Sequence, residues 1–210
     1  MIMRARITFS KQGALRYTGH LDLHRLWERA MRRADLPLSY SQGFHPQPKI
    51  SLASALPLGF SSRCEALDVR FNEEIPNDEI AARLQESLPP DIQIVRVESV
   101  DEKLPALQTQ VLSAVYQVQL TEPVDGWELS RRIEEILKAE SLPRERRSKF
   151  YDLRPLIEEL NLSTVGDRIS LHMKLAAREG ATGRPEEVLD MLGIAFEGTR
   201  IERTRLVFHS

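Results

Sequence analysis

Two kinds of periodic segment alternate along the chain, and their order restricts the fold. Residues 4–9 (RARITF) alternate polar and apolar side chains, which is typical of a strand with one buried face. Residues 20–35 repeat apolar side chains every three or four positions, which is typical of one face of a helix, and Pro37 ends it. The first half is further expected to contain strands at 38–40, 49–53, 64–72 and 92–98 and a helix that begins at residue 76 or 77. The order β-α-β-β-α-β is that of a ferredoxin-like unit.

The same order of elements is expected again after residues 101–110, which are typical of a linker. The second half is expected to contain strands at 111–120, 167–176 and 200–209, helices at 126–139 (with Trp127 among its apolar positions) and 184–193, and a basic stretch at 143–160. We therefore predict an α+β protein made of two tandem ferredoxin-like (βαββαβ) subdomains with antiparallel sheets. The subdomains are predicted at 1–100 and 111–210, joined by the linker at 101–110.

The composition indicates a globular domain of an intracellular protein. Of the 210 residues 41% are hydrophobic and 29% are charged, and the longest apolar runs are far shorter than a membrane span. Residues 1–10 have no apolar core of a signal peptide. The single cysteine, Cys64, excludes an internal disulfide and a cage built from cysteines alone. We expect a cytoplasmic protein without a membrane partner, a metal or another cofactor.

The charge is distributed unevenly along the chain. Residues 1–70 contain eleven Lys and Arg against five Asp and Glu, whereas the remaining residues contain 18 against 26. A basic half in a protein of net charge −2 indicates contact with an anionic partner, although a solvated surface has the same composition.

The motifs of common enzymes are missing. His20 and His24 are four residues apart, but no Glu follows the first histidine as in a zinc-binding H-E-x-x-H helix, and a partly buried structural role is expected for His24. Neither G-x-S-x-G nor a glycine-rich phosphate loop is present. A catalytic role would therefore fall on His20 or His45, acting as a general base.

Cations and aromatic side chains are interleaved around residues 16–49. Arg25, Arg29, Arg32 and Arg33 share the helix face opposite the apolar stripe. Aromatic rings that stack on bases, next to cations that follow the backbone, are used to bind single-stranded RNA. The predicted RNA- or anion-binding residues are Arg16, Tyr17, His20, Arg25, Arg29, Arg32, Tyr40, Gln42, Phe44, His45, Lys49 and, from a second basic stretch, Arg154. Alternatively, Tyr40 and Phe44 belong to the core and the prolines brace a loop.

Four short segments carry a family resemblance. They are RYTGHLD at 16–22, RRADLP at 32–37, YSQGFHPQPK at 40–49 and LPLG at 56–59, and a weaker one is FYDLRPLI at 150–157. In this order they resemble the radical SAM-associated domain family, a bacterial domain of unknown function. The resemblance implies partners, because members occur fused to or beside B12-type radical SAM proteins and with ribonuclease E/G-type proteins. This chain lacks the C-x-x-x-C-x-x-C cluster motif and would be the associated domain alone.

We interpret the chain as a non-catalytic RNA-binding or substrate-presenting accessory protein that works with a radical SAM enzyme or an RNA-processing partner. One alternative is a metal-independent endoribonuclease that uses His20 or His45 as its base. The other is an adaptor whose basic face docks an acidic protein.

Overall fold

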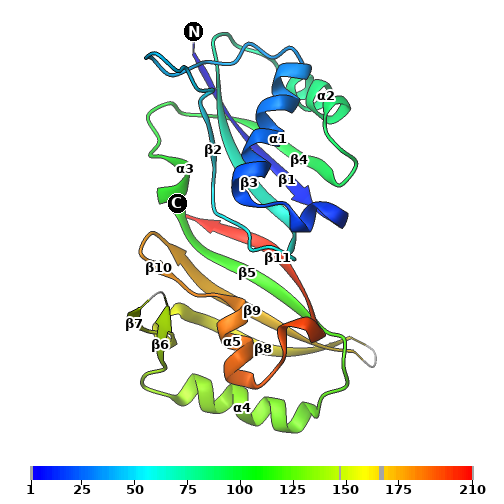
Figure 1. Cartoon of the computed structure of the whole chain (residues 1–210), viewed down its shortest axis with the longest axis vertical. Helices are drawn as coiled ribbons and strands as arrows, with labels where there is room; N and C mark the ends of the chain where they lie inside the picture. Colours follow the sequence, from blue (N-terminus) through cyan, green and yellow to red (C-terminus); the bar gives the residue numbers. More distant parts are fainter. Residues whose placement is uncertain (1, 147, 166–167, 210) are drawn as a thin grey trace. The chain divides into compact units, whose positions relative to one another are not determined.

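The chain divides into two compact units. The computed structural model describes residues 2–146, 148–165 and 168–209, and the first unit ends at Gln110 while the second begins at Val111 (Figure 1). Each unit combines helices with a sheet. In the part of the chain that is described, no helix is long and apolar enough to cross a membrane.

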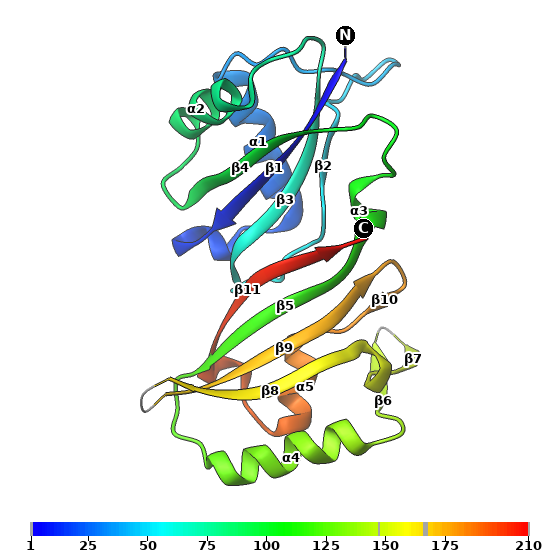
Figure 2. The ribbon, with the colours of Figure 1, turned by 180° about the vertical axis from the view of Figure 1, so that it is seen from behind.

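The first unit is a four-stranded sheet with two helices on one face. Its strands are β1 (Met3–Lys11), β2 (Ile50–Leu52), β3 (Ser61–Phe71) and β4 (Ile92–Val100), in the order β2-β3-β1-β4 with every neighbouring pair antiparallel. Helices α1 (His20–Arg33) and α2 (Asn77–Ser87) cover one face, and Figure 2 looks onto the other. The segment at 38–40 is not a strand, because Leu38 and Tyr40 form only isolated bridges.

The core of this unit lies between the sheet and α1. Alternation along β1 turns Ala5, Ile7 and Phe9 inward, and all three are fully buried. Trp27 of α1 packs edge-on against Phe9, with ring centroids 4.7 Å apart. The apolar stripe that the sequence places on α1 is therefore its buried face.

The opposite face of the sheet holds an ionic cluster that fixes residues 101–110. Arg4 and Arg6 both donate to the Asp68 carboxylate, at 2.6–3.1 Å. Arg4 also donates to the carbonyls of Leu104 and Pro105, at 2.7 and 2.8 Å. The segment expected to be a linker therefore packs onto the first unit, where it ends in the short helix α3 (Leu107–Gln110). A buried guanidinium needs such acceptors, and the linker backbone supplies them.

The second unit also has four paired strands in one antiparallel sheet. They are β5 (Val111–Leu120), β8 (Ile157–Val165), β9 (Arg168–Arg178) and β11 (Thr199–Phe208), with β9 and β5 in the middle and β8 and β11 outside them. Helices α4 (Gly126–Lys138) and α5 (Pro185–Leu192) pack against each other. A fifth, two-residue strand, β10 (Ala181–Thr182), pairs with β9 in the same sheet. The β6–β7 hairpin (Pro143–Arg146 and Lys149–Asp152) forms a separate two-stranded sheet.

The stretch at 143–160 is more structured than its composition indicates. It contains the β6–β7 hairpin and the start of β8, neither of which the sequence pattern predicts. The pairing of β8 with β9 shifts by one residue between Ile157 and Glu159, which is a bulge. A bulge interrupts the two-residue period at the start of this strand.

The α+β class is confirmed, and the strand pairing is mostly antiparallel. The tandem ferredoxin-like arrangement is not confirmed and stays a prediction, since the second unit inserts β6, β7 and β10 into the expected order of elements.

Candidate functional site

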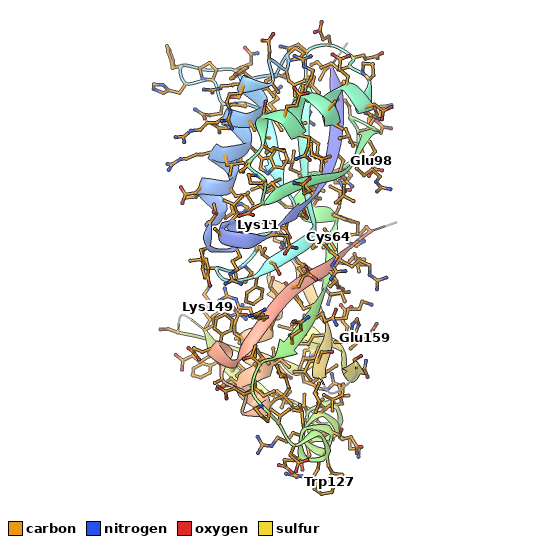
Figure 3. The ribbon with its side chains drawn as sticks, turned by 90° about the vertical axis from the view of Figure 1, so that its right-hand side faces the viewer. Lys11, Cys64, Glu98, Trp127, Lys149 and Glu159 are labelled. Atoms are coloured by element: carbon orange, nitrogen blue, oxygen red, sulfur yellow. The ribbon has the colours of Figure 1, made fainter. Side chains whose placement is uncertain are left out.

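The turn before α1 is held in place by two hydrogen bonds to its backbone carbonyls. Lys11, at the end of β1, donates its ammonium group to the Thr18 carbonyl at 2.8 Å, and the Gly59 N–H donates to the Arg16 carbonyl at 2.9 Å (Figure 3 labels Lys11). Gly13 has a φ of +55°, and a Cβ there would lie 2.4 Å from the Asp91 carboxylate. Glycine is favoured at this position, because the positive φ is rare for other residues and a side chain would displace the Asp91 carboxylate.

Helix α1 presents a row of arginines on its outer face. The spacing of Arg25, Arg29 and Arg32 places them on one side of the helix, and nitrogen-tipped side chains project from α1 in Figure 3. Arg32 and Arg33 lie in the last turn, where the helix dipole favours cations. The row is thus compatible with the stability of the helix that carries it.

Helix α2 completes a groove beside this row. Arg83 donates to the carbonyls of Ala34 and Asp35 at the end of α1, and Arg33 donates to the Ser87 carbonyl at 2.7 Å. These bonds dock the two helices. The resulting groove has a volume of about 900 Å³. Its lining consists of Thr18, Asp22, Arg25, Leu26, Arg29, Arg32, Arg33, Glu86, Ser87, Leu88 and Pro89.

The groove has an excess of positive charge. Four arginines line it, against the carboxylates of Asp22 and Glu86. The guanidinium groups of Arg29 and Arg32 make no hydrogen bond or ion pair to any residue that the structure describes. Arg25 approaches Asp22 at 3.5 Å, and both side chains are 68% exposed, so this pair contributes little. An anion that enters the groove would therefore meet cations that are not already neutralised.

The loop after α1 folds back on itself as a short hairpin-like projection, residues 39–49. The Ser41 N–H donates to the Gln47 carbonyl at 2.8 Å, and the Lys49 N–H donates to the Ser39 carbonyl at 2.9 Å. At the tip, Phe44 is fully exposed, and Gln42 and His45 are also exposed. Tyr40 is partly exposed, at 37%. The alternative in which Tyr40 and Phe44 belong to the core is wrong for both residues.

The cations do not all line one cavity. Lys49 lines a small cavity together with Arg4 and Arg70, whereas Arg25 lines the groove. The reason is the alternation along β2: Ile50 and Leu52 turn toward α1, and their neighbours turn toward the opposite face of the sheet. Two of the predicted RNA-binding residues, Arg25 and Lys49, therefore line different cavities.

In the turn before α1, the side chains of Arg16 and Tyr17 stack on each other. The Arg16 guanidinium lies over the Tyr17 ring, 4.9 Å from its centroid, and the Tyr17 side chain is 62% exposed. The Nε of Arg16 is buried and has no hydrogen-bond partner in the described structure. Tyr17 thus offers one exposed ring face near the start of α1.

The two histidines considered as catalytic bases, His20 and His45, lie on separate elements. His24 is partly buried, 3.1 Å from Glu28 and 3.3 Å from the Ile50 carbonyl, which confirms the structural role expected for it. His20 is exposed at the start of α1, and His45 lies at the tip of the projection. Among the residues that the structure describes, no group of three His, Cys, Asp or Glu side chains could hold a metal ion.

Arg154 lies in the second unit and is engaged with the backbone. Its guanidinium donates to the Leu137 carbonyl at 2.8 and 3.2 Å and to the Ile157 carbonyl at 3.1 Å. Leu137 is in the last turn of α4, so Arg154 caps that helix.

Residues 4–185 match one protein family, described as "Uncharacterized protein conserved in bacteria (DUF2344)". The chain belongs to this family. No curated protein matches this DUF2344 chain. Its association with radical SAM or ribonuclease E/G-type proteins stays an expectation from the resemblance.

Two solved structures share the fold of this DUF2344 protein. One is a Cbf5-Nop10-Gar1 complex, with 10% identity and a TM-score of 0.52 over 96% of this chain and 48% of the matched chain. The other is an H/ACA RNP bound to a substrate RNA containing 2'-deoxyuridine, with 10% identity and a TM-score of 0.50 over 96% and 47%. The DUF2344 chain therefore spans about half the length of the chains that it matches.

Sequence patterns did not indicate the second wall of the groove. Glu86 to Pro89 reach the arginine row only because α2 docks beside α1. No local signal in residues 86–89 marks them, since the contact is a tertiary one.

Proposed function

We propose that this protein is a non-catalytic RNA-binding accessory protein that holds single-stranded RNA and presents it to a radical SAM enzyme or an RNA-processing partner. The observation that carries the proposal is the row of Arg25, Arg29 and Arg32 in the groove, where two of the three guanidinium groups have no partner in the described structure. Phosphate groups are the anions that such a row would bind most strongly.

The length of the row suits a chain of phosphates better than a single one. Arg25 and Arg32 are seven residues apart, which corresponds to roughly 10 Å along a helix axis. Guanidinium groups spaced along a groove can follow an RNA backbone without reading its sequence. The carboxylates of Asp22 and Glu86 would repel phosphate groups. Phosphate binding is therefore expected to be strongest at the middle of α1.

The projection at 39–49 would supply base contacts. Phe44 offers both faces of its ring, and Tyr40 and His45 lie in the same projection. Stacking on such rings tolerates any base, which agrees with a protein that binds RNA by its backbone. Tyr17 would provide a further stacking face near the start of α1.

The fold comparison supports an RNA-related role without identifying one. One of the two neighbours is an RNP bound to a substrate RNA, and the fold alone is shared at 10% identity. We also propose that both units are variants of the ferredoxin-like unit, because each has four antiparallel strands in the relative order 2-3-1-4.

The proposal is tested by the affinity of labelled single-stranded RNA for the full chain at about 50 mM salt. We expect Arg29→Ala/Arg32→Ala to bind at least about tenfold more weakly, since two phosphate contacts are lost. The matched control is Arg96→Ala/Arg131→Ala, which removes two exposed arginines that are already paired with carboxylates. Its affinity should be unchanged within about twofold, because its net charge change is the same but no groove contact is lost.

The same samples separate the alternatives. If wild-type protein does not bind RNA at micromolar concentration, the proposal is wrong. Cleavage that disappears in His20→Ala or His45→Ala while binding persists would identify an endoribonuclease. Loss of an acidic protein partner in the groove variant, without RNA affinity, would identify an adaptor.

A further inference from the structure

We propose that the cavity lined by Lys49 is a second binding site, separate from the groove, for a single phosphoryl group. The cavity lies in the first unit on the sheet face opposite α1, the face that Figure 2 shows. Its volume is about 150 Å³, and its lining is Arg4, Lys49, Ser51, Asp68, Arg70, Leu104, Ala106 and Leu107.

The strands place the donors side by side. Ser51 is paired with Asp68 across β2 and β3, and the Arg70 N–H donates to the Lys49 carbonyl at 3.1 Å. Residues 49 and 51 are two apart, so their side chains leave the same face of the chain. Lys49, Ser51 and Arg70 therefore border one cavity from two adjacent strands.

The carboxylate in the cavity is already neutralised. Asp68 accepts four hydrogen bonds from Arg4 and Arg6, at 2.6–3.1 Å, and its side chain is 6% exposed. Two guanidinium groups on one carboxylate leave a local surplus of positive charge. A cation would be repelled from this position, so a metal ion is not the expected ligand.

The remaining donors suit a phosphoryl group. The ammonium group of Lys49 and the hydroxyl of Ser51 have no hydrogen-bond partner among the residues that the structure describes. Arg70 pairs with Glu102 at 2.8 Å through Nε alone, which leaves its two terminal nitrogens available for a second acceptor. A phosphoryl group brings about two negative charges and three acceptor oxygens, which matches an ammonium, a hydroxyl and a guanidinium.

The size of the cavity limits what enters it. Sites for whole drug-sized ligands have about 300–1,000 Å³, which is larger than this cavity. One tetrahedral group fits, and any nucleoside or other organic part attached to it would lie outside.

The test is calorimetric titration of the full chain with inorganic phosphate in a low-chloride buffer at neutral pH. Wild-type protein should bind one phosphate per chain. Lys49→Met should bind at least about tenfold more weakly, because a charge-assisted hydrogen bond contributes that much or more. The matched control is Lys103→Met, which removes an exposed lysine of the same unit that lies outside the cavity lining and should leave the affinity unchanged.

A second, smaller substitution in the same cavity keeps the test valid if Lys49→Met does not fold. Ser51→Ala removes only the hydroxyl and should weaken phosphate binding by roughly threefold to tenfold. Absence of saturable binding by wild-type protein, or equal loss in Lys49→Met and Lys103→Met, would overturn the proposal. Equal affinity of wild-type protein and both cavity variants would overturn it as well.

Two oligonucleotides identify the source of the phosphoryl group. If a 5′-phosphorylated oligonucleotide binds more tightly than its 5′-hydroxyl form, and Lys49→Met removes the difference, the site holds an RNA end. If inorganic phosphate binds but the two oligonucleotides are equivalent, the site holds a small phosphorylated molecule.

Discussion

Two arginines of α1 and the two arginines of α4 have the same chemistry but opposite surroundings. On α4, Arg131 binds Glu128 and Glu135, and Arg132 binds Glu128 and the Leu192 carbonyl. In α1, Arg29 and Arg32 have no partner in the described structure. The comparison teaches that a count of basic residues does not locate a binding surface, whereas the pairing of each residue does.

The pKa of Glu128 shows how completely α4 neutralises its own charges. Hydrogen bonds from Arg131 and then from Arg132 lower the pKa of this carboxyl from 4.5 to about 2. The carboxylate therefore stays ionised at any physiological pH, and both guanidinium groups keep their partner. An RNA phosphate would have to compete with that carboxylate on α4 but not at Arg29 or Arg32.

The largest expected effect concerns stability. Arg154→Met should lower the free energy of unfolding by about 2 kcal/mol, because hydrogen bonds from a charged group to the Leu137 and Ile157 carbonyls are lost. Arg29→Met should change it by less than about 0.5 kcal/mol, as expected for an exposed residue without partners. Urea denaturation followed by circular dichroism measures both. Equal losses of unfolding free energy in the two variants would contradict the distinction between arginines that stabilise the fold and arginines that have no partner.

The next effect concerns base stacking. Phe44→Ala should weaken single-stranded RNA binding by about 1–3 kcal/mol, which is the range for one stacked base. Phe150→Ala is the matched control, since Phe150 is 82% exposed on β7 of the second unit. We expect no change for it in fluorescence-anisotropy titrations. A comparable loss in both variants would show that exposed rings of either unit contribute alike.

The smallest effect is a pH dependence in the second unit. The backbone N–H groups of Leu142 and then Arg154 hold the pKa of Asp152 below its ordinary 3.8. The stability that this carboxylate contributes is present above pH 3.8 and is lost as the pH falls through the lowered pKa. The stability difference between wild-type protein and Asp152→Asn should therefore shrink between about pH 5 and pH 2. A difference that stays constant over this range would contradict the assignment.

The sequence predicted the helices and strands better than the surroundings of individual side chains. The apolar stripes of α1 and β1 identified the buried face of each, because periodicity reports burial directly. Trp127 was counted among the apolar positions of its helix, yet it is 74% exposed and projects from α4 in Figure 3. It occupies the second position of its helix, where the chain is only beginning to pack.

The candidate site was only partly predictable. The arginine row follows from helical spacing, and the exposure of Phe44 follows from a breaker-rich loop. The residues that border the cavity beside Lys49 depend on the pairing of β2 with β3, and the contacts of Arg154 depend on where α4 ends. Both are tertiary facts that no local pattern contains.

The central claim is that the available arginines of α1 bind RNA phosphates, and the salt dependence of RNA affinity tests it most directly. For single strands the slope of log K against log salt changes by about 0.7 for each phosphate contact. Arg29→Ala/Arg32→Ala should therefore flatten the slope by roughly 1.4, whereas Arg96→Ala/Arg131→Ala should leave it unchanged. Equal slopes for wild-type protein and the groove variant, or equal flattening in both double variants, would contradict the account.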